Sequence, residues 1–336
     1  MQDPQRNTPF NPGRRDLLAG ISAVLAGGAV PAWGQSGSSP NRPVNVIVPF
    51  GTGGAVQALT ERMGPDLNRE MGQPMINDYK GGAGGMLGGE IAARAQPNGY
   101  TLLLATPSAL AASPAVYKNP KYNPVTDFIP VSMVATTTFV LVVNSNLPIH
   151  NVRDLIAYGK ANPGKLNFAS AGVGSMDHVG GEVLQRLAGF KMTHIPYKGP
   201  GASLQDLVAG RLDALISSPI PVKPHVESGK IRAIAVTSNK RSPAMKDVAT
   251  IAEAGFPDYD MTSWYAYVAP TGTPREVVAK VDAAVKKALT NPNTVSFMEG
   301  FGLAPSTATP EEFGQILAQD IRRWKDWVKQ TGIQAE

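Results

Sequence analysis

Short apolar runs alternate with longer segments whose apolar positions recur every three or four residues. The runs predict buried strands, and the longer segments predict helices packed on a sheet. This alternation favours an α/β fold with parallel-rich sheets and right-handed crossovers. Strands are expected at residues 44–50, 75–79, 100–105, 131–134, 139–144, 167–170, 194–196, 214–217, 231–237 and 264–270. Helices are expected at residues 55–71, 85–95, 152–162, 176–188, 203–209, from 219 onward, 274–290 and 310–332.

Two of these strands divide the chain. Residues 139–144 and 264–270 bracket a self-contained α/β unit of about 120 residues, a common domain size. We expect the chain to pass from one lobe to a second at the first strand and to return at the other. This predicts a two-lobe fold with lobe 1 at residues 35–142 plus 267–336 and lobe 2 at residues 143–266. A ligand cleft is expected between the lobes, at the carboxyl ends of the strands.

The first 34 residues have a different pattern. Arg14 and Arg15 precede an apolar run at residues 17–30, and the small residues Ala32 and Gly34 follow. The run of about 14 residues is short for a membrane span. The pattern is typical of a signal peptide at residues 1–34, and the paired arginines indicate twin-arginine export to the periplasm. The alternative is a chance arginine pair before an N-terminal anchor.

Composition removes several classes of site. The 336 residues include no cysteine, so disulfides and thiolate-bound metals are excluded. The formal net charge of +5 is spread without a long basic run, a distribution that does not predict nucleic-acid binding. His178 and Glu182 lie one helical turn apart, but no second histidine is near them in the sequence. No metal, cofactor or nucleic-acid partner is expected.

Three glycine-rich turns are the strongest functional signal. They lie at residues 51–54, 81–85 and 170–175, each between a predicted strand and a predicted helix. The first N–H groups of such helices have no intrahelical partner, and together with the helix dipole they favour an anion. Three turns of this kind predict a cleft that binds a small anionic ligand. The alternative for each is an ordinary packing turn.

Catalytic motifs are missing from the sequence. There is no Gly-x-Ser-x-Gly elbow and no Gly-x-Gly-x-x-Gly run. Residues 159–165 have the glycine and lysine spacing of a phosphate-binding loop, but Leu166 stands where a hydroxyl is needed. That segment also ends a predicted helix and leads into a strand, the reverse of the required order. No catalytic residue is expected.

The ordered set of motifs resembles a known family. It runs through Pro49-Phe-x-x-Gly-Gly54, Gly81-Gly-Ala-Gly-Gly85, Pro97-Asn-Gly-Tyr-Thr-Leu102, Ala169-Ser-Ala-Gly-Val-Gly-Ser-x-x-His178, Pro196-Tyr-Lys-Gly199, Gly229-Lys-Ile-Arg-Ala-Ile-Ala-Val-Thr-Ser238, Glu253-Ala-Gly-Phe256, Trp264 and Ala269-Pro-Thr-Gly-Thr-Pro274. The chain is similar to the Bug family of extracytoplasmic solute receptors, the binding components of tripartite tricarboxylate transporters. The resemblance implies a type II periplasmic binding-protein fold that closes on one small carboxylate, held by loop N–H groups and hydroxyls.

One position departs from that family. An aspartate usually stands three residues after the second glycine of the first turn, and this chain has Gln57. An amide replaces a negative charge. A ligand with an ammonium group would lose a partner, whereas a plain carboxylate would lose a repulsion. This difference weakens the inference, drawn from amino-acid-binding members of the family, that the ligand is an amino acid.

The residues and the resemblance together give one set of expected ligand contacts, with Trp264 expected in the core or hinge rather than at the ligand. The expected ligand-binding residues are Phe50, Gly53, Gly54, Gln57, Gly84, Thr106, Ser108, Ser170, Gly172, Gly174, Ser175, His178, Tyr197, Ser217 and Ser218.

The hypothesis is a monomeric, non-enzymatic periplasmic receptor. It captures a small organic carboxylate, either a di- or tricarboxylate or an aromatic acid, for the membrane permease subunits of a tripartite tricarboxylate transporter. The alternatives are a secreted esterase or isomerase with the same two-lobe scaffold and a sensor that feeds a membrane kinase.

Overall fold

The computed structural model describes residues 40–335, which belong to one compact unit. The signal peptide expected at residues 1–34 lies outside the described residues. Within them, no helix is both long enough and apolar enough to cross a membrane. Two sheets carry the fold, as the alternating pattern predicts.

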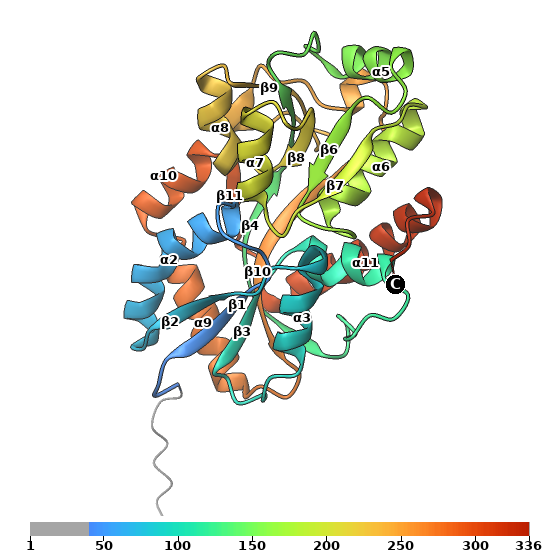
Figure 1. Cartoon of the computed structure of the whole chain (residues 1–336). Coiled ribbons are helices and arrows are strands. Elements are labelled where there is room, and N and C mark those ends of the chain that lie inside the picture. The colour runs from blue at the N-terminus through green and yellow to red at the C-terminus, as the bar shows by residue number, and fades with distance from the viewer. Residues whose placement is uncertain (1–39, 336) are drawn as a thin grey trace, which may run out of the picture. The chain divides into compact units, whose positions relative to one another are not determined.

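The first sheet has six strands in the order β11-β4-β10-β3-β1-β2 (Figure 1). They are β1 (Val44–Val48), β2 (Met75–Tyr79), β3 (Thr101–Ala105), β4 (Phe128–Thr138), β10 (Thr262–Pro270) and β11 (Leu303–Pro305). Both β2 and β3 are parallel to β1, whereas β10 is antiparallel to β3 and β4, and β11 is antiparallel to β4. The sheet is therefore mixed, and its parallel part contains the strands that precede the first two glycine turns.

Helices cover both faces of this sheet because its strands alternate. In β1, Val46 and Val48 pack with α2 (Ala55–Met71) and α9 (Arg275–Ala288), and Ile47 packs with α3 (Met86–Ala93) and α11 (Pro310–Thr331). Figure 1 shows the two pairs of helices on opposite sides. The helix expected at 310–332 is confirmed as α11.

The second sheet has five strands in the order β7-β6-β8-β5-β9. They are β5 (Val140–Asn144), β6 (Asn167–Ser170), β7 (Thr193–Pro196), β8 (Ala214–Ser217) and β9 (Ile231–Val236). Strands β7 and β8 are parallel to β6, and β5 is antiparallel to β8 and β9. Helices α5 (Val152–Ala161) and α6 (Met176–Ala188) cover one face, and α7 (Pro200–Val208) and α8 (Pro219–Glu227) cover the other.

The chain changes sheets twice. It leaves the first sheet at Phe139, between β4 and β5, and returns within residues 237–261, between β9 and β10. The lobe boundaries predicted at 142/143 and 266/267 therefore fall within β5 and β10. Each of these strands belongs to one sheet over its whole length.

Several elements were not expected. They are the π-helical turn η3 (Ser108–Ala112) with α4 (Ser113–Val116), the 3₁₀ turns η2 (Ala83–Gly85), η4 (Pro243–Met245) and η5 (Ala252–Ala254), helix α10 (Pro292–Gly300), and β11. Strand β4 is also longer than the expected 131–134, because Thr136, Thr137 and Thr138 continue it against β10. Because threonine is polar, the pattern of apolar residues alone does not predict that the strand continues to Thr138.

Candidate ligand-binding site

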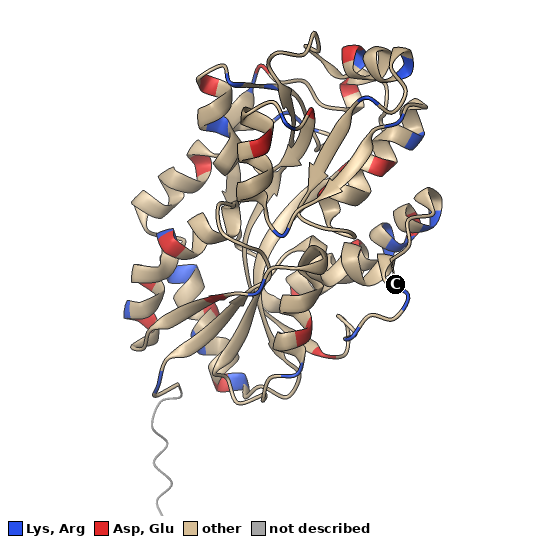
Figure 2. Cartoon of the chain, viewed as in Figure 1, with Lys and Arg blue, Asp and Glu red and all other residues tan. Residues whose placement is uncertain are grey.

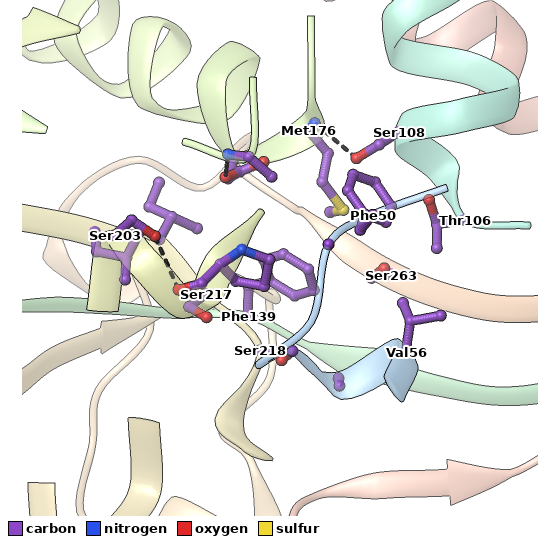
Figure 3. A pocket seen from close by; sticks show the side chains of 18 of the residues that line it. Phe50, Val56, Thr106, Ser108, Phe139, Met176, Ser203, Ser217, Ser218 and Ser263 are labelled. Atoms are coloured by element: carbon purple, nitrogen blue, oxygen red, sulfur yellow. Dashed lines mark hydrogen bonds between the residues drawn. The ribbon is translucent and has the colours of Figure 1, made fainter. Parts of the chain in front are cut away.

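A small cavity of about 60 Å³ lies where residues of both sheets meet (Figure 3). Since one enclosed water needs about 10–15 Å³ by this measure, the cavity has room for about four waters. It is lined by Phe50, Gly51, Gly54, Ala55, Val56, Thr106, Ser108, Phe139, Ala171, Met176, Asp177, Pro200, Ser203, Leu215, Ile216, Ser217, Ser218, Ser263 and Tyr265. The carboxyl ends of β1, β3, β6 and β8 supply much of this lining, which is the usual place for a ligand in α/β sheets.

Four helices begin at the cavity. Their N-caps are Gly54 for α2, Ser175 for α6, Gly199 for α7 and Ser218 for α8, and no N-cap side chain caps its helix. The first backbone donors of a helix carry a partial positive charge when they have no capping side chain. Four such ends at one cavity favour an anionic group inside it.

The cavity contains no basic side chain among the described residues. Its one acidic side chain is Asp177, which is 5% exposed and accepts a hydrogen bond from the Ala171 amide at 2.7 Å. Burial raises the pKa of this carboxyl to about 6. An anion bound here would be held by N–H and O–H groups rather than by a lysine or arginine.

The hydroxyls that line the cavity differ in their partners. Ser108 Oγ accepts from the Met176 amide at 3.0 Å and so joins the two sheets, and Ser203 Oγ donates to the Pro200 carbonyl at 3.0 Å. Ser263 Oγ is buried and has no hydrogen-bond partner in the structure. Tyr265 lies two residues along β10, on the same face as Ser263, and burial raises the pKa of its phenol.

The structure places six of the expected ligand-binding residues at the cavity: Phe50, Gly54, Thr106, Ser108, Ser217 and Ser218. The other nine do not line it: Gly53, Gln57, Gly84, Ser170, Gly172, Gly174, Ser175, His178 and Tyr197. Their role as ligand contacts stays a prediction.

Gln57 forms its hydrogen bonds outside the cavity. Its Oε1 accepts from the Gly53 amide at 2.7 Å, and its Nε2 donates to Glu61 Oε1 at 2.7 Å. The side chain therefore supports the turn before α2. The position that distinguishes this chain from the family pattern does not face the cavity in this structure.

The polar side chains of residues 170–178 support their own loop. Ser170 Oγ lies 2.6 Å from His194 Nε2, and Ser175 Oγ donates to the Gly172 carbonyl at 2.6 Å. His178 Nδ1 accepts from the Gly174 amide at 3.1 Å. These bonds fix the loop that carries Ala171 and Asp177 to the cavity.

His178 and His194 form a buried pair behind this loop. Their rings stack with centroids 3.8 Å apart. Burial lowers the pKa of His178 to about 3, with a further lowering from His194, and burial lowers that of His194 to about 4. Both rings are neutral at pH 7. Within the described residues, no group of three or more His, Cys, Asp or Glu side chains is placed to hold a metal ion.

Tyr197 is also engaged away from the cavity. Its hydroxyl donates to Asp206 Oδ2 at 2.5 Å, and Arg211 binds the other oxygen of that carboxylate. Burial, followed by the Asp206 hydrogen bond, raises the pKa of the phenol to about 12. The side chain binds near the end of α7, and Tyr197 does not line the cavity.

The glycines of the turns bring the two sheets together. An added Cβ would lie 2.6 Å from Gly201 Cα at Gly53 and 2.7 Å from the Ser175 amide at Gly84. At Gly172 it would lie 2.7 Å from the Gly84 amide. We call this contact of residues 51–54 and 81–85 with residues 172–175 and 198–201 the glycine seam. Only glycine allows these backbones to approach so closely.

Sequence reasoning missed most of the apolar wall and four residues with polar side chains. These are Gly51, Ala55, Val56, Phe139, Ala171, Met176, Asp177, Pro200, Ser203, Leu215, Ile216, Ser263 and Tyr265. Ser263 and Tyr265 could have been predicted to lie together, because alternate residues of a strand share a face. Asp177 directly precedes the predicted His178, at the start of α6.

Trp264 lies on the opposite face of β10. Its indole N–H donates to Asp320 at 2.6 Å, and its ring packs edge-on against Phe313. The expected place in the core is confirmed.

Comparison with known proteins agrees with this geometry. The family model described as "Tripartite tricarboxylate transporter family receptor" matches residues 60–333. BugT of Bordetella pertussis is 35% identical over 317 residues, which span 94% of this chain and 97% of BugT. The structure of R. palustris Rpa4515 with adipate is 33% identical, with a TM-score of 0.84 and coverage of 88% of this chain and 99% of that chain.

A further solved structure is MatC from Rhodopseudomonas palustris with bound malate. It is 30% identical, has a TM-score of 0.83, and covers 86% of this chain and 99% of its own. Family match, sequence relatives and fold agree over most of the chain, and they confirm the resemblance and the non-enzymatic receptor class. The chain belongs to the tripartite tricarboxylate transporter receptor family.

Proposed function

We propose that this protein captures a small organic carboxylate in the periplasm and delivers it to the membrane permease subunits of a tripartite tricarboxylate transporter. The observation that carries the proposal is the meeting of four helix N-termini, none capped by its own N-cap side chain, at one cavity whose lining among the described residues includes no basic side chain. Such a site stabilises a negative group by oriented backbone dipoles. The adipate and malate bound by two relatives are organic carboxylates.

The wall of the cavity supports an organic ligand rather than an inorganic ion. Phe50, Phe139 and Leu215 line it together with the hydroxyls. Apolar side chains stabilise the carbon skeleton, and the polar groups orient the carboxylate. The small volume favours a ligand with few atoms.

The glycine seam supports a mechanism of lobe closure. Residues 198–201 touch residues 51–54 beside the cavity, and the Gly51 amide donates to the Lys198 carbonyl at 3.4 Å. We propose that the lobes open to admit the ligand and close along this seam, which hides the ligand and forms the surface that the permease recognises. The ligand then selects the closed state because both lobes contact it.

A thermal-shift screen of carboxylates at fixed pH tests the function. A ligand at about 100 times its Kd should stabilise the folded protein by about 2.7 kcal/mol, and the corresponding neutral amides should not. Recovery of the ligand unchanged separates a receptor from the enzyme alternative. If no carboxylate raises Tm, the proposal is wrong.

Location and assembly are part of the same proposal. Export is expected through the signal peptide at residues 1–34 by the twin-arginine route, and the receptor is expected to be a monomer. Replacing Arg14 and Arg15 by lysine should leave the precursor in the cytoplasm. Periplasmic accumulation of that variant would exclude this route. A dimer in analytical ultracentrifugation would contradict the expected monomer.

A further inference from the structure

Asp177 brings a carboxyl group into a cavity that favours an anion. It begins α6 next to the N-cap Ser175, lines the same small space as the three other helix N-termini, and is 5% exposed. One of its oxygens is held by the Ala171 amide. A bound carboxylate would therefore share a small, largely apolar space with this group.

Within residues 40–335, no neighbouring cation offsets the charge of Asp177. His178 on its own helix and His194 on β7 are neutral above about pH 5, because burial lowers the pKa of both rings. Helix α11, packed on α6, carries the charged pair of Asp320 and Arg323, which bind each other at 2.7 Å.

The other elements beside Asp177 bring no charge. Tyr265 of β10, across the cavity, stays neutral because burial raises the pKa of its phenol. Strands β6 and β8 and the turn η3, which also pack on α6, contain no titratable residue.

Two carboxylates that share one site do not both stay ionised, because each raises the pKa of the other. We propose that Asp177 admits a carboxylate without a cationic group only in its protonated form, so that each capture takes up one proton. The inference rests on the proposed function and specifies its ligand class and its coupling. Protonated Asp177 becomes a hydrogen-bond donor to the ligand instead of a like charge.

The proton is available close to neutral pH. Burial raises the pKa of free Asp177 to about 6, so part of the unliganded receptor already carries the proton there. Above that pH, each further unit should raise the Kd about tenfold, because a smaller fraction of the receptor is protonated. A ligand with an ammonium group should behave differently, since it pairs with ionised Asp177 and needs no proton.

Calorimetry of the unmodified protein tests the proposal. Adipate or malate, whichever binds, is titrated at about pH 7.5 in two buffers with different ionisation enthalpies, HEPES and Tris. We expect uptake of about one proton per bound ligand and a Kd that rises about 100-fold from about pH 6.5 to about pH 8.5. Binding without proton uptake would overturn the inference and leave the proposed function intact. If neither acid binds, the thermal-shift screen decides the function separately.

Two variants test whether Asp177 is the group that binds the proton taken up with the ligand. D177N keeps the shape of the side chain without its charge, and it should bind with no proton uptake and little pH dependence. D326N removes an exposed carboxylate on α11 outside the cavity and should keep both effects. Proton uptake that persists in D177N would place the proton elsewhere and contradict the proposal. If D177N does not fold, the two-buffer measurement on the unmodified protein still decides.

Discussion

At the scale of single residues, Ser263 is the clearest indication that the cavity binds a ligand with a polar group. Its Oγ is buried without a partner, and a buried hydroxyl in that state lowers stability. We expect Ser263→Ala to leave Tm unchanged or higher while it weakens carboxylate binding by about 1.5–3 kcal/mol, or about 10- to 150-fold. Thermal melting and calorimetry on one sample separate the two effects.

A matched control exists for this prediction. Ser242 Oγ is also buried and without a partner, but it does not line the cavity. Ser242→Ala should therefore match Ser263→Ala in stability and match the unmodified protein in affinity. Equal affinity of all three proteins would show that the ligand does not use Ser263.

At the scale of elements, the glycine seam explains where glycine is required. Gly201 lies in the first turn of α7, and an added Cβ would meet the Thr52 carbonyl at 2.8 Å and Gly53 Cα at 3.3 Å. Gly201→Ala should favour the helix but obstruct closure, and overpacking of this kind costs about 1–3 kcal/mol. We expect affinity to fall about tenfold, with a larger radius of gyration in X-ray scattering of the liganded protein.

Gly64→Ala is the control for the seam. Gly64 lies within α2, and its added Cβ would meet nothing within 4 Å. Pro65 follows Gly64 and disfavours helical geometry for a residue with a Cβ, so that variant should gain little from helix propensity and should bind normally. An unchanged affinity in Gly201→Ala would mean that closure does not need the seam.

At the scale of the whole molecule, the charges of the described residues are mixed in sign. In Figure 2 acidic and basic residues are interspersed over the helices of both sheets. We expect acid stability to depend on buried groups, above all on the stacked pair of His178 and His194. Their pKa values in the folded state lie below the ordinary value of 6.5, at about 3 and about 4.

The sign of the pH dependence follows from this depression. Below about pH 6.5 the unfolded chain binds protons on both histidines and the folded protein does not, so stability falls as the pH falls. Asp177 acts in the opposite direction, because its raised pKa of about 6 favours folding at acid pH, and so do Glu182 and Asp320, whose pKa values burial also raises, but the larger pKa shifts of the two histidines dominate. We expect Tm to fall by about 5 °C between about pH 7 and about pH 5.

A variant assigns this effect to the pair. His194→Gln should flatten the dependence of Tm on pH, whereas a change at exposed His150 should leave the slope as it is. A slope that is equal in both variants would place the acid sensitivity in other groups.

Local pattern gave correct elements wherever apolar spacing was regular. Val56, Leu59, Met63 and Leu67 recur at helical spacing, and all are buried on one face of α2. The pattern failed where short segments form structure by long-range pairing, as in β11, which pairs with Ala135, Thr136 and Thr137 of β4.

The residues of the candidate site likewise fall into those that local pattern predicts and those that depend on long-range contacts. Gly54, Ser217 and Ser218 end strands or begin helices, so their place at the cavity follows from strand–helix order. Ser170 and Tyr197 lie in similar positions, but their hydroxyls form hydrogen bonds with His194 and Asp206. Sequence does not show these partners, because each is brought near by the folded sheet.

The sequence by itself determined the alternation of strands and helices, the glycine turns and the family. These depend on spacing within a few residues and on motif order. Only the tertiary structure decided which groups face the cavity. The place of Asp177 and Ser263 depends on two crossings between sheets, which bring β10 and the start of α6 together from positions more than 80 residues apart. Such contacts are selected by the burial of the whole core, and no local pattern encodes them.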